Sequence, residues 1–164
     1  MTEIFTPGPD HSRALRSAFG RFATGVTVVT APGPDGPVGM TANSFSSVSL
    51  DPAMALWCIG KASDRFHVFG TAPRFAIHIL AEDQIEISNG FAKSSAYFDS
   101  CAWAPGADEV PAIEGCLARF DCRLNTAHDA GDHVILVGDV LEVTLREGAP
   151  LLFAGGAYGR AEAL

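Results

Sequence analysis

A stretch of short polar side chains between two turns carries the most chemical potential in this sequence. It runs from Gly39 to Leu50, after the P-G-P-D-G turn at 32–36 and before Asp51-Pro52. Short hydroxyl and amide side chains fill a core poorly, and they need hydrogen-bond partners when buried. We interpret the stretch as a surface that faces a polar ligand, with backbone N–H groups as further donors. The alternative is a solvated loop. The side chains concerned are Thr41, Asn43, Ser44, Ser46, Ser47 and Ser49.

The composition is that of one folded domain, and it argues against two classes of function. The 164 residues are 48% hydrophobic and 18% charged, which supplies a core and excludes a disordered chain. The formal net charge of −8 and the pI near 4.9 argue against non-specific nucleic-acid binding and against docking on an anionic membrane.

Neither an export signal nor a metal-binding pattern is visible. The start of the chain lacks a basic region followed by a long apolar run, and no apolar stretch reaches transmembrane length. The four cysteines form no C-x-x-C pair, and the five histidines are scattered without ligand spacing. We therefore expect a cytoplasmic protein whose cysteines are reduced and mostly buried, and no metal site.

The hydrophobic pattern predicts many strands and few helices. A first helix, capped by Asp10 and ended by Gly25, should pack Leu15, Phe19 and Phe22 on the sheet. Two more helices are expected, a short one capped by Ser63 and one at 82–91 interrupted at Asn89-Gly90. Residues 93–111 read as a loop with short structured pieces. Strands are expected at 26–30, on both sides of a break near residues 43–44, and at 53–60, 75–80, 116–124, 133–145 and after 150.

This strand-rich order favours a β-barrel over a doubly wound sheet. Neither the dinucleotide-binding pattern G-x-G-x-x-G after a strand nor the P-loop pattern occurs, so a nucleotide would bind without them. His78 alternates with apolar neighbours in its expected strand, which favours a structural role over a catalytic one.

Three sequence elements in this order resemble a known family. They are T-G-V-T-V-V-T at 24–30, M-T-A-N-S-F at 40–45 and G-D-H at 131–133. The chain from about Leu15 to Tyr158 is similar to the short-chain flavin reductases with an FMN-binding split barrel. Together, the three elements are far more specific than any one of them alone.

The resemblance implies a fold, an activity and partners. The fold would be mainly β, a six-stranded antiparallel split barrel with flanking helices, and residues 1–164 would form one domain. The protein would be a homodimer that binds FMN or FAD and takes hydride from NADH or NADPH. It would supply reduced flavin to a partner monooxygenase.

The resemblance also implies a set of site residues. His133 would lie near the flavin and the nicotinamide, as the catalytic residue, and Tyr158 near the same site. The other flavin contacts would be Met40, Thr41, Ala42, Asn43, Ser44, Ser46, Cys58, Ile59, Lys61, Ser63, Phe91 and Ala92.

Several of these positions also have plain structural interpretations. Ser63 suits a helix cap, Phe91 suits a core, and Lys61 suits an exposed turn. Many relatives carry D-K-F where this chain has A-Y-F at 96–98, which puts a role for that loop's charges in doubt. Lys61 and Lys93 are both candidates for binding the flavin phosphate.

Two other function classes compete with the flavin reductase. One is a non-enzymatic FMN-binding protein, a carrier or sensor on the same barrel. The other is a β-barrel interaction module without a cofactor, which the hydroxyl-rich stretch disfavours. Flavin transfers hydride by its own chemistry, so the protein mainly has to hold and orient two rings, and no nucleophile or acid–base pair is required.

Overall fold

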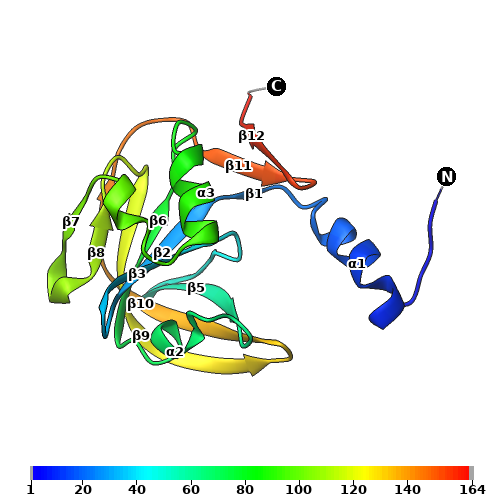
Figure 1. Ribbon diagram of the computed structural model, residues 1–164, viewed down its shortest axis with the longest axis horizontal. Helices are drawn as coiled ribbons and strands as arrows, with labels where there is room; N and C mark the ends of the chain where they lie inside the picture. Colours follow the sequence, from blue (N-terminus) through cyan, green and yellow to red (C-terminus); the bar gives the residue numbers. More distant parts are fainter. Residues whose placement is uncertain (1, 163–164) are drawn as a thin grey trace.

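One antiparallel sheet of seven strands forms most of the molecule (Figure 1). The computed structural model describes residues 2–162. The strand order is β3-β2-β6-β9-β10-β5-β4, so β3 and β4 are the two edges. The strands are β2 (Thr27–Gly33), β3 (Gly36–Ala42), β4 (Ser46–Leu50), β5 (Ala53–Gly60), β6 (Arg74–Ile79), β9 (Ala118–Ala130) and β10 (His133–Leu145).

The expected mainly β class is confirmed, but the expected six-stranded barrel is wrong in two details. The sheet has seven strands, and it does not close through pairing of β3 with β4. The edge strand β3 is bonded to the loop that follows helix α3 (Ile85–Lys93) and not to β4. The N–H of Gly39 donates to the carbonyl of Ser95 in that loop at 2.9 Å. Between β3 and β4, the Ser44 side chain bonds to β5 at Cys58. The predicted break near residues 43–44 is confirmed.

Smaller elements complete the fold. A three-stranded sheet contains β1 (Thr24–Gly25), β11 (Leu151–Ala154) and β12 (Ala157–Arg160), and a hairpin contains β7 (Trp103–Pro105) and β8 (Pro111–Ile113). The helices are α1 (Ser12–Phe19), α2 (Phe66–Phe69) and α3 (Ile85–Lys93), with 3₁₀ turns η1 (Pro9–His11), η2 (Tyr97–Ser100) and η3 (Ala107–Glu109). The short pieces expected within 93–111 are therefore confirmed.

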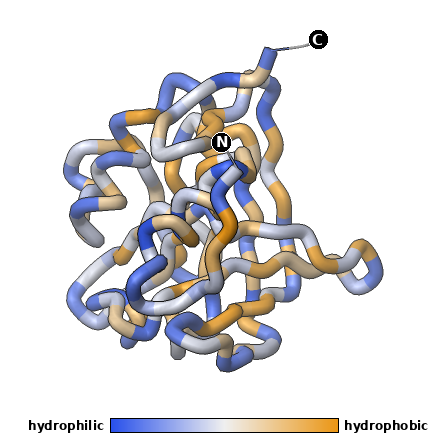
Figure 2. Tube along the Cα trace, turned by 90° about the vertical axis from the view of Figure 1, so that its right-hand side faces the viewer, coloured by the Kyte–Doolittle hydropathy of each residue, from blue (hydrophilic) through white to orange (hydrophobic). Residues whose placement is uncertain are grey.

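Two apolar clusters lie on opposite sides of the sheet's β2 and β3. The first surrounds Trp57 and Phe75 and receives every second side chain of β5, because side chains alternate between the faces of a strand. The second surrounds Phe91 and joins β2 to α3 and to the β7–β8 hairpin. In Figure 2 the interior strands are largely orange and the outer turns mostly blue, in agreement with this burial.

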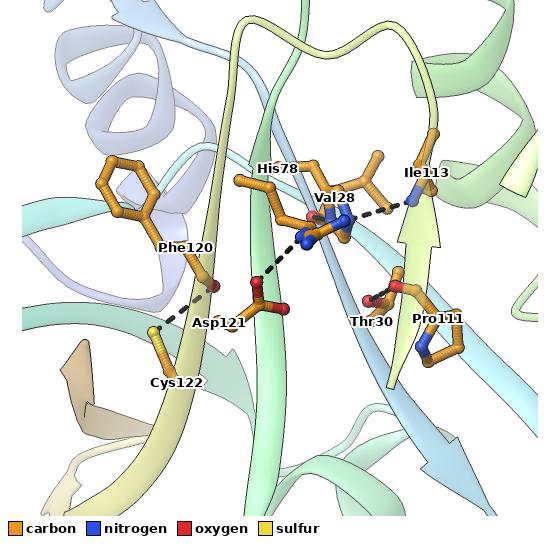
Figure 3. A network of polar contacts seen from close by, with 9 residues as sticks. Val28, Thr30, His78, Pro111, Ile113, Phe120, Asp121 and Cys122 are labelled. Carbon is orange, nitrogen blue, oxygen red and sulfur yellow. Dashed lines mark hydrogen bonds and ion pairs between the residues drawn. The ribbon is translucent and has the colours of Figure 1, made fainter. Parts of the chain in front are cut away.

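His78 fastens the β7–β8 hairpin to the sheet, as its strand position suggested. It is fully buried, and its Nδ1 bonds to the carbonyl of Val28 at 3.0 Å (Figure 3). Its Nε2 accepts the N–H of Ile113 at 3.1 Å. The carbonyl can only accept, so Nδ1 carries the proton. A structural role for His78 is confirmed by these two bonds.

Three expectations about local structure are wrong. The first helix begins at Ser12 without a side-chain cap, has no buried residue and extends away from the sheet (Figure 1). The expected connection after residue 124 is strand: β9 continues to Ala130, and a tight turn through Gly131 at φ 68° leads directly into β10. Helix α3 is not interrupted at Gly90, where a Cβ would overlap the ring of Tyr97; this close contact explains the glycine.

Candidate flavin site

Three segments far apart in the sequence meet at one cavity of about 210 Å³, the Asn43 cavity. The end of β3 contributes Thr41 and Ala42, and Asn43 follows directly. Helix α3 contributes Ala92, and β12 contributes Tyr158. All five were predicted as flavin contacts, and the fold brings them to the same place. The remaining lining residues are Val26, Ser88 and Phe153.

Hydrogen bonds to α3 hold two of these side chains in place. The Thr41 hydroxyl donates to the carbonyl of Ser88 at 2.6 Å. The Tyr158 hydroxyl donates to Asn89 Oδ1 at 3.0 Å and lies 2.8 Å from the buried hydroxyl of Ser88. By contrast, Asn43 is exposed, so its amide is accessible to a ligand. Ser88 was missed at the sequence level; its only signal is the four-residue spacing to Ala92, which places both on one helix face.

A second group joins the end of β3 to β5. The Ser44 hydroxyl accepts the N–H of Cys58 at 2.9 Å and lies 3.1 Å from its carbonyl oxygen. Burial raises the pKa of the Cys58 thiol, although the bond to Ser44 opposes the shift. The thiol is therefore neutral near pH 7 and does not act as an anion or a nucleophile.

Four predicted contacts are placed less favourably. Ile59 and Phe91 are both 0% exposed, and the Phe91 ring packs edge-to-face on Tyr97 and Phe98. In this conformation neither residue is accessible to a ligand. Met40 packs against the first apolar cluster. Ser46 is exposed on the edge strand β4 and does not line the Asn43 cavity.

His133 and Lys61 lie together where β5 and β10 pair. His133 is opposite Gly60 in the strand register, and its Nδ1 is 2.7 Å from Asp132 Oδ1. This hydrogen bond and the nearby imidazole lower the pKa of Asp132. The Lys61 ammonium pairs with Asp129 and donates to the carbonyl of Gly131 at 2.6 Å. Lys61 therefore ties the β5 turn to the β9–β10 hairpin.

Arg65 was not singled out at the sequence level, and it lies between two of the predicted groups. Its backbone N–H donates to the Ser63 hydroxyl at 3.3 Å, and its Nη1 donates to the carbonyl of Phe91 at 2.6 Å. Ser63 itself is not the helix cap, because α2 begins after Arg65. Nothing in the local pattern marks Arg65, since an arginine at a turn is normally exposed.

Residues 2–162 contain neither a metal-ligand cluster nor a membrane-spanning helix. No group of three or more His, Cys, Asp or Glu side chains is arranged to hold a metal ion within that range. No helix there is long and apolar enough to cross a membrane.

Comparison with known proteins places this chain in a family. The chain is 53% identical over 157 residues to the FMN reductase (NADH) SmoA of Agrobacterium fabrum. The match covers 96% of this chain and 90% of that protein. It is 51% identical over 148 residues to the reductase component of a flavin-dependent trigonelline monooxygenase of Acinetobacter baylyi. That match covers 89% of this chain, which spans only 48% of the relative.

The fold agrees with the same assignment. The solved structure of the Streptomyces globisporus NADH:FAD oxidoreductase SgcE6 in complex with NAD and FAD fragments superposes with a TM-score of 0.88. The sequence identity is 38%, and the match covers 97% of this chain and 98% of that one. The model of the flavin reductase like domain matches residues 19–162. This chain therefore belongs to the flavin reductase family.

Proposed function

We propose that the protein is an NADH-dependent flavin reductase that reduces FMN or FAD and delivers the reduced flavin to a partner monooxygenase. The observation that carries this proposal is the Asn43 cavity, where predicted contacts from β3, α3 and β12 meet in a chain of this family. The names of the relatives support it, since they include an NADH-dependent FMN reductase and a monooxygenase reductase component.

The residues around this cavity suit a flavin ring. The flavin edge carries carbonyl oxygens and ring nitrogens, which accept from the Asn43 amide and from backbone N–H groups of 40–46. When bound, flavin supplies the hydride-accepting chemistry. Thr41 and Tyr158 are held by α3, so they present fixed walls, and a fixed wall orients a ring without further loss of side-chain entropy.

His133 has a positioning role in this proposal. Its Nδ1 proton is directed to Asp132, so in the neutral ring Nε2 is left as an acceptor. Nε2 can accept from the carboxamide N–H of a nicotinamide. His133 begins β10 and pairs with β5, and a strand end is a rigid mount for such a contact.

Steady-state assays test the proposal directly. We expect NADH oxidation that requires added FMN or FAD, faster with NADH than with NADPH. A non-enzymatic carrier or sensor would instead bind flavin, detected by fluorescence quenching, without oxidising NADH. Failure to bind any flavin at micromolar concentration would contradict both functions.

We also propose that the protein is a cytoplasmic homodimer. Helix α1 buries none of its own residues, and Phe19 and Phe22 are 70% and 77% exposed. Leu50 and Leu145 are 96% and 77% exposed. Apolar patches exposed on a monomer commonly mark protein–protein contacts, and we expect a second copy to cover these side chains.

A further inference from the structure

A buried cation near the proposed flavin site lacks a buried counter-charge. Arg65 is only 9% exposed, and its Nε has no hydrogen-bond partner among residues 2–162. The carboxylate of Asp64 is 3.7 Å from Nε, but its side chain is 87% exposed. A solvated partner stabilises a charge weakly, whereas a buried charge is costly unless it is well paired. The guanidinium is therefore suited to an anion supplied by a ligand.

The position of Arg65 suggests which anion this is. Arg65 lies two residues after Ser63 and bonds to the carbonyl of Phe91, the residue before Ala92. It thus joins two groups of residues that were predicted to contact the flavin. Arg65 also lines a cavity of about 590 Å³, together with Val38, Ser95 and Trp103. A phosphate group at Arg65 would have room, and the tail could continue into the cavity.

The two lysines considered from the sequence are less suitable. Lys61 is engaged with Asp129 and with the carbonyl of Gly131. Lys93 is exposed in the last turn of α3, where a cation interacts favourably with the helix carbonyls. Neither lysine lines the cavity that Arg65 lines. Arg65 is already immobilised by Phe91, and a planar guanidinium matches two phosphate oxygens at once.

We propose that Arg65 binds the phosphate attached to the ribityl chain of the flavin, a group that FMN and FAD share and riboflavin lacks. This inference rests on the proposed flavin-binding function. Asp35, Asp64 and Asp99 also line the cavity and oppose a phosphate. Their side chains are exposed, so solvent screens them, and the buried Arg65 outweighs them.

The test compares dissociation constants for FMN and riboflavin, measured by fluorescence quenching. In the natural protein FMN should bind more tightly than riboflavin. In Arg65→Gln we expect FMN binding to weaken about tenfold or more, with riboflavin binding changed less than threefold. The FMN affinity of Arg65→Lys should fall between that of the natural protein and that of Arg65→Gln. Asp64→Asn should tighten FMN but not riboflavin, because it removes a nearby negative charge.

Lys61→Gln and Lys93→Gln are the matched controls, since each removes one positive charge. The inference is overturned if Arg65→Gln leaves the ratio of the two dissociation constants unchanged, or if a lysine variant changes it instead. It is also overturned if Arg65→Gln alters only the KM for NADH, because Arg65 would then contact the pyrophosphate of NADH and not the flavin phosphate. If Arg65→Gln does not fold, Arg65→Lys and Asp64→Asn decide. A natural protein that binds neither flavin contradicts the proposed function instead.

Discussion

His133 is the residue whose role is divided most evenly between chemistry and structure. It is tied to Asp132 at 2.7 Å, yet half of its side chain is exposed at the end of β10. We predict that His133→Ala keeps the fold but raises KM for NADH, lowers kcat, or both. The effect should be about tenfold or more, which corresponds to ~1.4 kcal/mol of lost positioning.

The control for this variant is Asp132→Asn, which weakens the tie and keeps the imidazole. If His133 acts through its ring, Asp132→Asn should have the smaller kinetic effect, and neither variant should melt much earlier. Normal kinetics together with a lowered melting temperature for His133→Ala would assign it to the strand end and not to the site.

Asn43 differs from its neighbours because its side chain is exposed at the cavity wall. We predict that Asn43→Ala weakens flavin binding more than it lowers the stability of the flavin-free protein. Loss of one hydrogen-bond partner that a ligand buries costs on the order of 1–3 kcal/mol. Fluorescence quenching gives the dissociation constant, and thermal unfolding without flavin gives the stability.

Asn125 offers a matched control for that experiment. It is also an exposed asparagine, but on β9, where it bonds to Asp139 at 2.8 Å. Asn125→Ala should leave flavin affinity unchanged. An unchanged dissociation constant for Asn43→Ala would remove Asn43 from the site.

At the scale of elements, His78 makes the attachment of the β7–β8 hairpin depend on pH. Burial, helped by the charge of Arg119, lowers the pKa of His78 from 6.5 to about 4, while the bond to Val28 opposes the shift. Between these pH values the unfolded chain binds a proton that the folded protein does not. Stability should therefore be complete above about pH 6.5 and fall as the pH approaches 4.

The expected loss is about 3 kcal/mol over that window, from ~1.4 kcal/mol per pKa unit. Urea unfolding at several pH values measures it. His78→Leu should be less stable at pH 7, because it leaves the N–H of Ile113 unpaired and removes the side-chain bond to the carbonyl of Val28. The variant should also lose this part of the pH dependence. An equally steep decline in His78→Leu would assign the effect to other groups.

At the scale of the whole molecule, α1 and its exposed phenylalanines suggest how two copies associate. We predict that light scattering gives twice the 17.2 kDa mass of the chain at micromolar concentration. Phe19→Asp should shift the protein towards the monomer, because the substitution places a charge on the apolar face that the partner would cover.

A charge placed elsewhere separates association from general destabilisation. Ala104 is exposed on β7, on the side of the molecule opposite α1 (Figure 1). Ala104→Asp should remain a dimer. A natural protein that scatters as a monomer would contradict the proposed association.

The sequence by itself determined the features that depend on local chemistry. β-branched runs set β2 and β10, the polar pair Asn43-Ser44 broke β3 from β4, and alternation marked His78 as structural. The three motifs also identified the family, because motif residues are read directly and need no geometry.

Only the tertiary structure decided the features that depend on contacts between distant segments. The seven-strand order, the burial of Arg65 and the contact of Lys61 with Asp129 all join residues that no local pattern relates. Likewise, Gly90 reads as a helix breaker until the ring of Tyr97 is seen against it. Local sequence specifies the conformation and preferred faces of a segment, but its partners are set by packing, and packing determines which charge is buried.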